Sequence, residues 1–307
     1  MGNIVVVGSS NTDLVVTTLH LPQPGETLLG NEINIHPGGK GANQVVATAR
    51  ANAKATFIAK VGKDDFGQKA IEGYKSDNIN VDHIIIDPQH PSGIAVILVE
   101  ESTGQNSIVV VGGANNFLSV GDIKNTESVI AAADTLLLQL EIPVDVVEFT
   151  LRIAKNNRVK TILNPAPAKE LPDKLLRMVD IITPNESETK FLTGIEPDSE
   201  ENIQKAACLL LKKVNEAVII TLGDRGAYFC EVNGDMGFIP STKVEAVDST
   251  AAGDVFNGYL AALLAGGSDL RNAISLANKA AAISVTRKGA QPSIPKLSEI
   301  LTNFEVC

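Results

Sequence analysis

The sequence predicts an α/β fold in which a central, mostly parallel sheet is covered by helices on both faces and a small β-sheet forms a lid. Short apolar runs alternate with helical segments along most of the 307 residues, and this alternation indicates parallel strands joined by right-handed crossovers. Two stretches instead carry strand patterns without a helix between them. We therefore predict an α/β domain formed by residues 1–13, 36–92 and 112–307, and a β lid formed by residues 14–35 and 93–111.

The composition is that of an ordinary globular protein, with 44% hydrophobic and 20% charged residues. The net charge of -10 and the lack of a Lys/Arg run argue against nucleic acid as a partner. No stretch approaches the ~20 apolar residues of a membrane span, and the N-terminus shows no secretory signal pattern. Cys208, Cys230 and Cys307 lack the spacing of a metal site and suit free thiols in a reducing compartment. We expect a cytoplasmic protein.

The first strand is predicted at Asn3–Val7, a short apolar run followed by Gly8-Ser9-Ser10. Asn11 and Asp13 come next, at the strand end where open α/β sheets bind ligands. The same two residues could equally form a turn. Residues 14–35 alternate without a helical period, which indicates short antiparallel strands.

A glycine-rich segment follows, reading H-P-G-G-K-G-A-N-Q from His36 to Gln44 and leading into an Ala-rich helix predicted at Val45–Arg50. Three glycines around Lys40 at a helix start can form a backbone-lined cradle for a polar ligand. The spacing is neither that of a Walker loop nor that of a dinucleotide fingerprint. Taken alone, such a segment is more often a structural turn than a ligand site.

The remaining elements continue the alternation. Strands are predicted at 56–61 and 81–86 around a helix at 64–77, and a hairpin at 93–100 and 106–111. Beyond residue 120 the order is regular, with helices expected at 120–133, 143–156, 252–264 and 270–285, strands at 135–140, 160–163, 180–183 and 217–222, a helix start at 184–188, and an edge hairpin at 227–232 and 236–239.

Polar residues recur where these strands end, and together they predict one crevice along the carboxyl edge of the sheet. They are Asn11, Asp13, Glu141, Asn164, Asn185, Glu188, Thr221 and Gly223. The spacing of Asn185 and Glu188 places an amide and a carboxylate one helical turn apart, where they could stand near a hydrated Mg²⁺. An ordinary helix N-terminus with favourable acidic residues explains the same pair.

The stretch from Val247 to Leu264 runs from a polar loop through small residues into an apolar helix. Asp248, Ser249 and Thr250 are typical of a helix start. The small residues 251–253 would let an anion approach the unpaired N–H groups of the first turn. Asp254 then either stabilises the helix start or takes a proton from a hydroxyl that attacks a bound phosphate.

These motifs, taken in order, resemble those of the ribokinase family of carbohydrate kinases over essentially the whole chain. The resemblance rests on residues 38–44 (G-G-K-G-A-N-Q) and 248–254 (D-S-T-A-A-G-D), and on four shorter matches between them: Asn11-Thr12-Asp13, Asn164-Pro165-Ala166-Pro167, Thr183-Pro184-Asn185-Glu186 and Thr221-Leu222-Gly223. The tail from Thr286 to Ser293 is also similar to that of the family. Several matches in the right order are far more specific than any one of them.

The resemblance implies ATP-dependent phosphorylation of ribose at its primary hydroxyl, giving ribose 5-phosphate. Asp254 would be the general base, and the backbone N–H groups of Ala251, Ala252, Gly253 and Asp254 would form the anion hole. By the same resemblance the sugar would be bound by Asn11, Asp13, Gly39, Lys40, Asn43, Glu141 and Asp254.

The resemblance also implies a cofactor set: ATP as co-substrate, Mg²⁺ or another divalent cation, and K⁺ as activator. The nucleotide would contact Asn185, Thr221, Gly223, Asp224, Gly226, Gly253 and Asn278. Glu188 would hold Mg²⁺, directly or through water. K⁺ would be held by Asp248, Thr250, Ser284, Arg287, Gly289 and Ser293. The lid would form the contact of a homodimer.

Small departures from the family pattern concern Ser249, where Thr is frequent, the His36-Pro37 pair, where an apolar pair is frequent, and Asn278, which is His in some members. Deoxyribose, fructose or a nucleoside remain alternative substrates, because one hydroxyl can decide specificity. A non-catalytic sugar-responsive regulator would not need Asp254. The loop after the first strand, G-S-S-N-T-D, disfavours a dinucleotide-dependent oxidoreductase, and the four scattered histidines disfavour a zinc site or a His-based triad.

Overall fold

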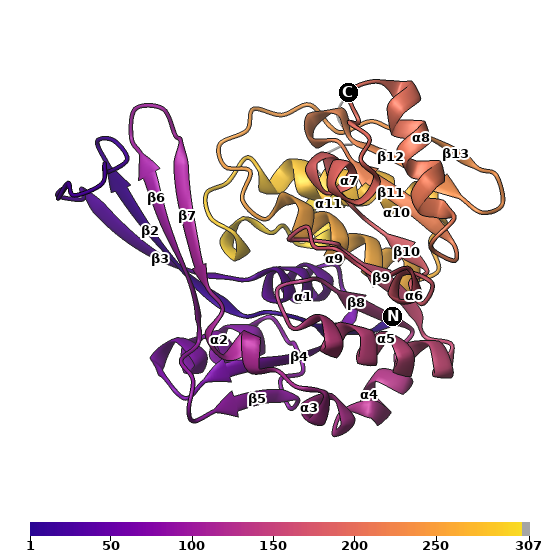
Figure 1. The fold of residues 1–307 in the computed structure, drawn as a ribbon, viewed down its shortest axis with the longest axis horizontal. Helices are drawn as coiled ribbons and strands as arrows, with labels where there is room; N and C mark the ends of the chain where they lie inside the picture. The colour runs from indigo at the N-terminus through magenta and orange to yellow at the C-terminus, as the bar shows by residue number, and fades with distance from the viewer. Residues whose placement is uncertain (303–307) are drawn as a thin grey trace.

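The computed structural model describes residues 1–302, so Cys307 lies outside the described residues. The central sheet has nine strands in the order β13-β12-β11-β10-β9-β8-β1-β4-β5 (Figure 1). All neighbouring pairs are parallel except β11–β12 and β12–β13. The strands are β1 Asn3–Val7, β4 Lys54–Gly62, β5 Ile84–Asp87, β8 Thr135–Leu138, β9 Lys160–Leu163, β10 Ile181–Ile182, β11 Ala217–Thr221, β12 Ala227–Glu231 and β13 Met236–Ile239. The predicted fold class is confirmed.

The interior strand β1 is apolar from Ile4 to Val7, because both of its faces are buried. Ile4 and Val6 face one core, whereas Val5 and Val7 face the other. The first core is covered by α1 Lys40–Arg50, α2 Asp65–Ser76, α9 Ala252–Ala265, α10 Leu270–Ser284 and α11 Leu297–Thr302. The second is covered by α3 Val120–Lys124, α4 Glu127–Ala131, α5 Val144–Asn157, α6 Asp173–Leu176 and α8 Glu200–Leu211. None of the helices within residues 1–302 combines the length and apolar character needed to cross a bilayer.

A second sheet of four strands stands away from this body (Figure 1). Its order is β3-β2-β6-β7, with β2 Asn11–Thr18, β3 Glu32–Gly38, β6 Gly93–Glu100 and β7 Asn106–Val111. The strands β2 and β3 reach three residues beyond the segment 14–35 at each end. Asn11 and Asp13 therefore lie on a strand of the small sheet itself. The division of the chain into two domains remains a proposal.

Several element boundaries were wrong. The helix expected at 45–50 begins at Lys40, because Gly39 with φ 90° serves as its N-cap. The helix expected at 120–133 is two helices, α3 and α4, each with a first turn of its own after Ser119 and Thr126. The strand at 180–183 shrinks to the two residues of β10.

Helix α8 had not been predicted, although its sequence signals were readable. Ser199 caps it by accepting a hydrogen bond from the Asn202 N–H. Its buried residues, Ile203, Ala206, Ala207 and Leu210, follow the spacing of an amphipathic helix.

The packing of α1 against α9 matters most for the candidate site, because both helices begin at the carboxyl edge of the sheet. Gly258 lies at the crossing, where an added Cβ would come within 2.5 Å of both the Ala47 Cβ and the Gln44 backbone oxygen. The Thr48 hydroxyl donates to the Gln44 oxygen at 2.8 Å and lies 3.3 Å from the Gly258 oxygen. The two helices therefore touch backbone to backbone.

Candidate active site

Two adjoining cavities lie at the carboxyl edge of the central sheet, with volumes of about 420 Å³ and about 220 Å³. Their shared wall is formed by Asn185, Thr221, Ala252 and Gly253. The larger cavity continues toward Gly226 and Asn278, and the smaller one ends at Lys40 and Asp254. The first turn of α9 thus separates two spaces that can hold two reactants side by side.

Asp254 is 5% exposed and sits in the first turn of α9. Its Oδ2 accepts a hydrogen bond from the Asn43 side-chain nitrogen at 2.9 Å, and its Oδ1 accepts one from the Gln44 side-chain nitrogen at 2.9 Å. Burial raises the pKa of Asp254, while the nearby Lys40 ammonium and the two amide donors oppose that rise. A carboxylate with a raised pKa and a fixed orientation suits proton abstraction.

Lys40 is the first residue of α1 and faces several acidic groups. The charges of Asp254 and Glu141 raise its pKa against the effect of burial, so Lys40 stays protonated. Glu141 is held in place by two donors, the Lys40 backbone N–H at 3.0 Å and the Ser9 hydroxyl at 2.5 Å. The Lys40 ammonium thus lies among carboxylates at the end of the smaller cavity.

Asp13 reaches the same region from β2. Burial raises its pKa to about 6, and the negative charges of Glu141 and Asp254 add to that effect. Its carboxylate lies against Gly38, where any Cβ would overlap it. A cluster of carboxylates around one lysine favours ligands that donate several hydrogen bonds, as a polyol does.

The glycines of the 38–41 segment are required by close contacts with the loop after β1. Gly39 has φ 90°, and a Cβ there would lie 2.7 Å from the Asn11 backbone nitrogen. At Gly41 a Cβ would lie 2.6 Å from the Gly8 carbonyl carbon. The start of α1 therefore rests directly on the end of β1, which brings Asn11 and Lys40 to one place.

The start of α9 presents open N–H groups to both cavities. Its N-cap, Ala251, adopts the left-handed conformation with φ 63° and makes no side-chain cap. The N–H of Ala252 lies 3.3 Å from the Ser249 oxygen, whereas those of Gly253 and Asp254 lie in the turn that has no intrahelical acceptors. No atom lies within 4 Å of a Cβ built on Gly253, so a ligand has room there.

Asn185 and Glu188 form a capping box at the start of α7 Glu186–Thr193. The Asn185 side-chain oxygen accepts from the Glu188 N–H at 2.8 Å, and the Glu188 carboxylate accepts from the Asn185 N–H at 2.9 Å. Glu188 is buried and lines the smaller cavity, and burial raises its pKa. Asn185 and Glu188 therefore do stabilise the start of a helix. Glu188 also lines the smaller cavity, where a hydrated cation would fit.

The other predicted nucleotide residues divide between two cavities. Thr221, Gly223, Gly226 and Asn278 line the larger cavity described above. Asp224 instead lines a neighbouring cavity of about 480 Å³, which Gly223 and Ala252 also border. The Asn278 side-chain nitrogen donates to the Ile239 oxygen at 3.1 Å, so Asn278 also holds the end of β13.

Three of the predicted K⁺ residues, Asp248, Thr250 and Gly289, meet where the 247–250 loop touches the segment after α10. Asp248 accepts hydrogen bonds from the N–H groups of Thr250 and Gly289, at 2.9 Å and 2.8 Å. Ser284 and Ser293 are buried and donate to carbonyls of their own turns. Arg287 forms an ion pair with Glu299. The atoms available to a cation here are oxygens, which hard cations prefer as ligands. Within residues 1–302 there is no group of three or more His, Cys, Asp or Glu residues that could hold a metal ion.

Three buried amides of this region had not been assigned a role from the sequence. Asn115 accepts from the Ser10 N–H at 2.8 Å and donates to the Asn11 side-chain oxygen at 2.8 Å. Gln44 contacts Asp254, and Gln139 contacts Gln44. Gln44 belongs to a recognisable motif, but Asn115 and Gln139 act over about 100 residues of separation, for which a single sequence carries no signal.

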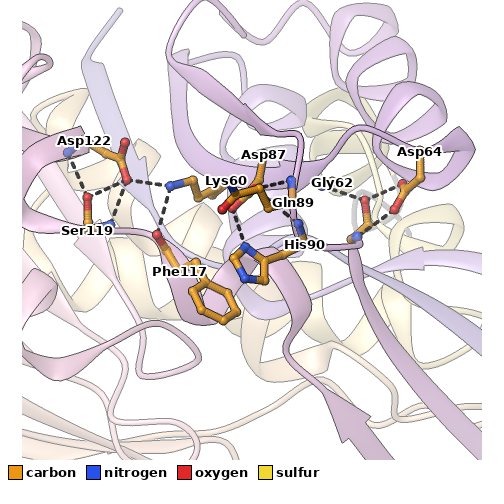
Figure 2. Close-up of polar contacts among 10 residues, drawn as sticks. Lys60, Gly62, Asp64, Asp87, Gln89, His90, Phe117, Ser119 and Asp122 are labelled. Carbon is orange, nitrogen blue, oxygen red and sulfur yellow. Dashed lines mark hydrogen bonds and ion pairs between the residues drawn. The ribbon is translucent and has the colours of Figure 1, made fainter.

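A polar network anchors the base of the small sheet to the body (Figure 2). The Asp64 carboxylate accepts from the Ser92 N–H and hydroxyl, both at 2.7 Å, just before β6 begins. Asp87 accepts from the Gln89 N–H at 2.8 Å, and the His90 ring stacks on Phe117. The segment leading into β6 is therefore held firmly where it leaves the central sheet.

Comparison with known proteins places these features in a family. The family model described as pfkB family carbohydrate kinase matches residues 1–297. The chain is 45% identical to a ribokinase of Haemophilus influenzae over 98% of each chain, and 36% identical to a deoxyribokinase of Salmonella typhi over 97% of each. A solved structure of Arabidopsis thaliana ribokinase complexed with ribose and ATP superimposes with a TM-score of 0.91 at 31% identity, covering 98% of this chain and 97% of that one.

We predict that Asp13→Asn stabilises the ligand-free protein at pH 8 but hardly at pH 4. The pKa of Asp13 is raised from 3.8 to about 6, so the folded state prefers the protonated form. The stability that this preference gives the fold is fully present below pH 4. As the pH rises through 6, the free energy of unfolding falls by up to about 3 kcal/mol. Urea unfolding at both pH values measures the difference. The exposed Asp82, changed to Asn, is the control and should give the same small effect at both. An Asp13→Asn effect independent of pH would contradict the prediction.

Proposed function

The chain belongs to the pfkB family of carbohydrate kinases, and from that premise we propose that it transfers the γ-phosphoryl group of ATP to the primary hydroxyl of D-ribose, giving ribose 5-phosphate. The observation that carries the proposal is the position of Asp254, a buried carboxylate in the first turn of α9 that lines the smaller cavity, one residue after Gly253 in the wall shared with the larger cavity. The similarity to ribokinases over nearly the whole chain supports ribose as the acceptor.

In the proposed reaction Asp254 is the general base. The sugar hydroxyl gives its proton to an Asp254 oxygen while its own oxygen bonds to the γ-phosphorus. The bond from that phosphorus to the β–γ bridging oxygen breaks, and ADP leaves. Backbone N–H groups at 251–254, of which those of Gly253 and Asp254 lie in the first helical turn without intrahelical acceptors, stabilise the charge on the transferred group.

The sugar is proposed to lie in the smaller cavity, against Lys40 and Asp254. Its hydroxyls would contact the residues expected from the sequence: Asn11, Asp13, Gly39, Lys40, Asn43 and Glu141. Asn43 gives the clearest support, because its side-chain oxygen is buried and has no hydrogen-bond partner among residues 1–302. A ligand hydroxyl would supply the missing donor.

ATP is proposed to occupy the larger cavity, with its phosphates toward α9. Asn185, Thr221, Gly223, Gly226, Gly253 and Asn278 line that cavity, and Asp224 borders its continuation. Glu188 would hold Mg²⁺ through water, since its buried carboxylate faces the phosphate end. When bound, Mg²⁺ neutralises phosphate charge.

K⁺ is proposed to bind at Asp248 and Thr250, with Ser293 and the backbone oxygens of Ser284, Arg287 and Gly289. The chain runs from Asp248 straight into the first turn of α9, so a cation there would fix the loop that shapes the anion hole. The Asp248 carboxylate already joins this loop to Gly289.

Deoxyribose is the second candidate substrate, favoured by the 36% identity to a deoxyribokinase over nearly the whole chain. It differs from ribose by one hydroxyl, which buried polar groups can discriminate strongly. We also propose a cytoplasmic location, since the free thiols of Cys208 and Cys230 suit a reducing compartment. Cell fractionation would test it.

A coupled ADP-release assay with MgATP and K⁺ tests the proposed reaction, using ribose, deoxyribose, fructose, adenosine and uridine. We expect the highest kcat/KM for ribose. Asp254→Asn is the matched control, and it should lower kcat by roughly 10²–10⁴ because it removes general base catalysis. A higher kcat/KM for another sugar would replace ribose as the proposed substrate. No turnover of any of these compounds by folded protein would overturn the kinase proposal.

Activity should rise when K⁺ replaces Na⁺ or a bulky organic cation at constant ionic strength. The reason is that only an ion of suitable size can satisfy oxygen donors fixed by the backbone. The same comparison with Asp248→Asn should show a smaller response. Equal rates in all three salts would exclude the proposed cation site.

A homodimer through the small sheet is proposed, because this sheet exposes apolar side chains at Ile33, Ile35, Ile108, Val109, Val110 and Val111. We expect Val109→Lys to shift the protein from dimer to monomer in sedimentation velocity. Val232→Lys, an equally exposed valine outside the sheet, is the control and should leave the mass unchanged. A monomeric wild-type protein, or a dimer that tolerates Val109→Lys, would refute this interface.

A further inference from the structure

A chain of two buried side-chain amides leads from Asp254 into the interior, away from both cavities. Gln44 donates from its side-chain nitrogen to Asp254 Oδ1 at 2.9 Å. Gln139, at the end of β8, donates from its side-chain nitrogen to the Gln44 side-chain oxygen at 2.6 Å. Both glutamines are fully buried. Neither lines the cavities proposed for sugar and nucleotide.

The orientation of both amides follows from the carboxylate. An ionised Asp254 can only accept hydrogen bonds, so Gln44 must turn its nitrogen toward it. The same nitrogen donates to the Asn164 side-chain oxygen at 3.1 Å, which uses both of its hydrogens. The Gln44 oxygen must then face the other way, where it needs a donor. Gln139 supplies that donor.

This arrangement leaves one polar atom without a partner at the end of the amide pair that is farther from Asp254. The Gln139 side-chain oxygen is buried and has no hydrogen-bond partner among residues 1–302. It occupies the space that a Cβ on Gly8 would need. An unpaired buried oxygen destabilises the fold, so its retention points to a role that the opposite orientation of Gln139 could not serve.

We propose that Gln44 and Gln139 are positioning residues that fix the Asp254 carboxylate, with Gln44 holding Oδ1 and Gln139 acting only by holding Gln44. The inference rests on the proposed role of Asp254 as general base. With Oδ1 bonded to Gln44 and Oδ2 bonded to Asn43, the carboxylate is held in one orientation at the wall of the smaller cavity.

The charged groups that face Asp254 come from other elements: Lys40 at the start of α1, Asp13 on β2, Glu141 after β8 and Glu188 on α7. They act on Asp254 through charge, whereas the Gln139 side chain bonds to Gln44. Replacing the glutamines with methionine leaves all these charges in place. Any change at Asp254 would then come from the lost amide contacts.

The test measures the titration of Asp254 directly, by ¹³C NMR of protein labelled at aspartate carboxyl carbons. The Asp254 signal is assigned by its loss in Asp254→Asn. We expect Gln44→Met to raise the pKa of Asp254 by about one unit, since a donor to the ionised form is lost. Gln139→Met should raise it by less. Gln44→Met should also lower ribose-dependent kcat roughly 10-fold, with KM for ATP nearly unchanged, and should shift the acidic limb of the kcat–pH profile upward.

The double variant gives the sharpest outcome. If Gln139 acts only through Gln44, Gln44→Met with Gln139→Met should match Gln44→Met alone in both the pKa and kcat. Thr48→Val is the control, because Thr48 is buried one turn further along α1 and bonds only to backbone oxygens of Gln44 and Gly258. It should leave the pKa of Asp254 unchanged.

Additive effects of the two methionines, or an Asp254 signal that titrates alike in wild type and Gln44→Met, would overturn the inference. Should Gln44→Met fail to fold, Gln139→Met, which does not touch Asp254, still gives the pKa shift or its absence. The NMR measurement needs no substrate. A shifted pKa in a protein that phosphorylates no sugar would therefore count against the proposed function and leave the positioning role standing.

Discussion

The contact between α1 and α9 is the constraint on which the rest of the site depends. Gly258 permits it, because a side chain there would overlap Ala47 and the backbone of Gln44. At this separation Asn43 and Gln44 reach Asp254 at hydrogen-bond distance, although more than 200 residues separate them in sequence. A second close contact, Gly41 against Gly8, places the start of α1 on the end of β1. Backbone contacts made possible by glycine thus bring the end of β1 and the starts of α1 and α9 to one edge.

Electrostatics at this edge work against stability. Burial raises the pKa values of Asp13, Glu188 and Asp254, which means that their ionised forms are disfavoured where they stand. At Asp254 the Lys40 charge offsets part of the rise in pKa, and the amide donors of Asn43 and Gln44 each offset a further, smaller part. A protein selected only for stability would replace such a group with apolar side chains. Disfavoured charges concentrated at the carboxyl edge of the sheet, beside a cavity, are characteristic of a functional site.

The family and the fold class could be predicted from the sequence, because the parallel strands are apolar runs and the motifs at 38–44 and 248–254 are specific. Local signals were less reliable at boundaries: the N-cap role of Gly39 was not recognised, and the break at Asn125 and Thr126 inside 120–133 was missed. Gln139 and Asn115 could not be found, since their partners lie about 100 residues away in the chain. Roles given to single site residues by resemblance remain proposals that the geometry supports.

The path of β2 links the small sheet to the site more tightly than a separate lid would. This strand starts with Asn11 and Asp13, and the Asp13 carboxylate interacts through charge with Glu141 and Asp254. The strand then continues as a central strand of the small sheet, so it belongs to both. Asn115 clamps its first residue, and the Asp64–Ser92 contact holds the neighbouring strand β6 where it leaves the body (Figure 2). A displacement of the small sheet must therefore either bend β2 or move Asn11 and Asp13. Because Lys40 and Asp254 are fixed to the body, such a displacement would change the shape of the proposed sugar pocket directly.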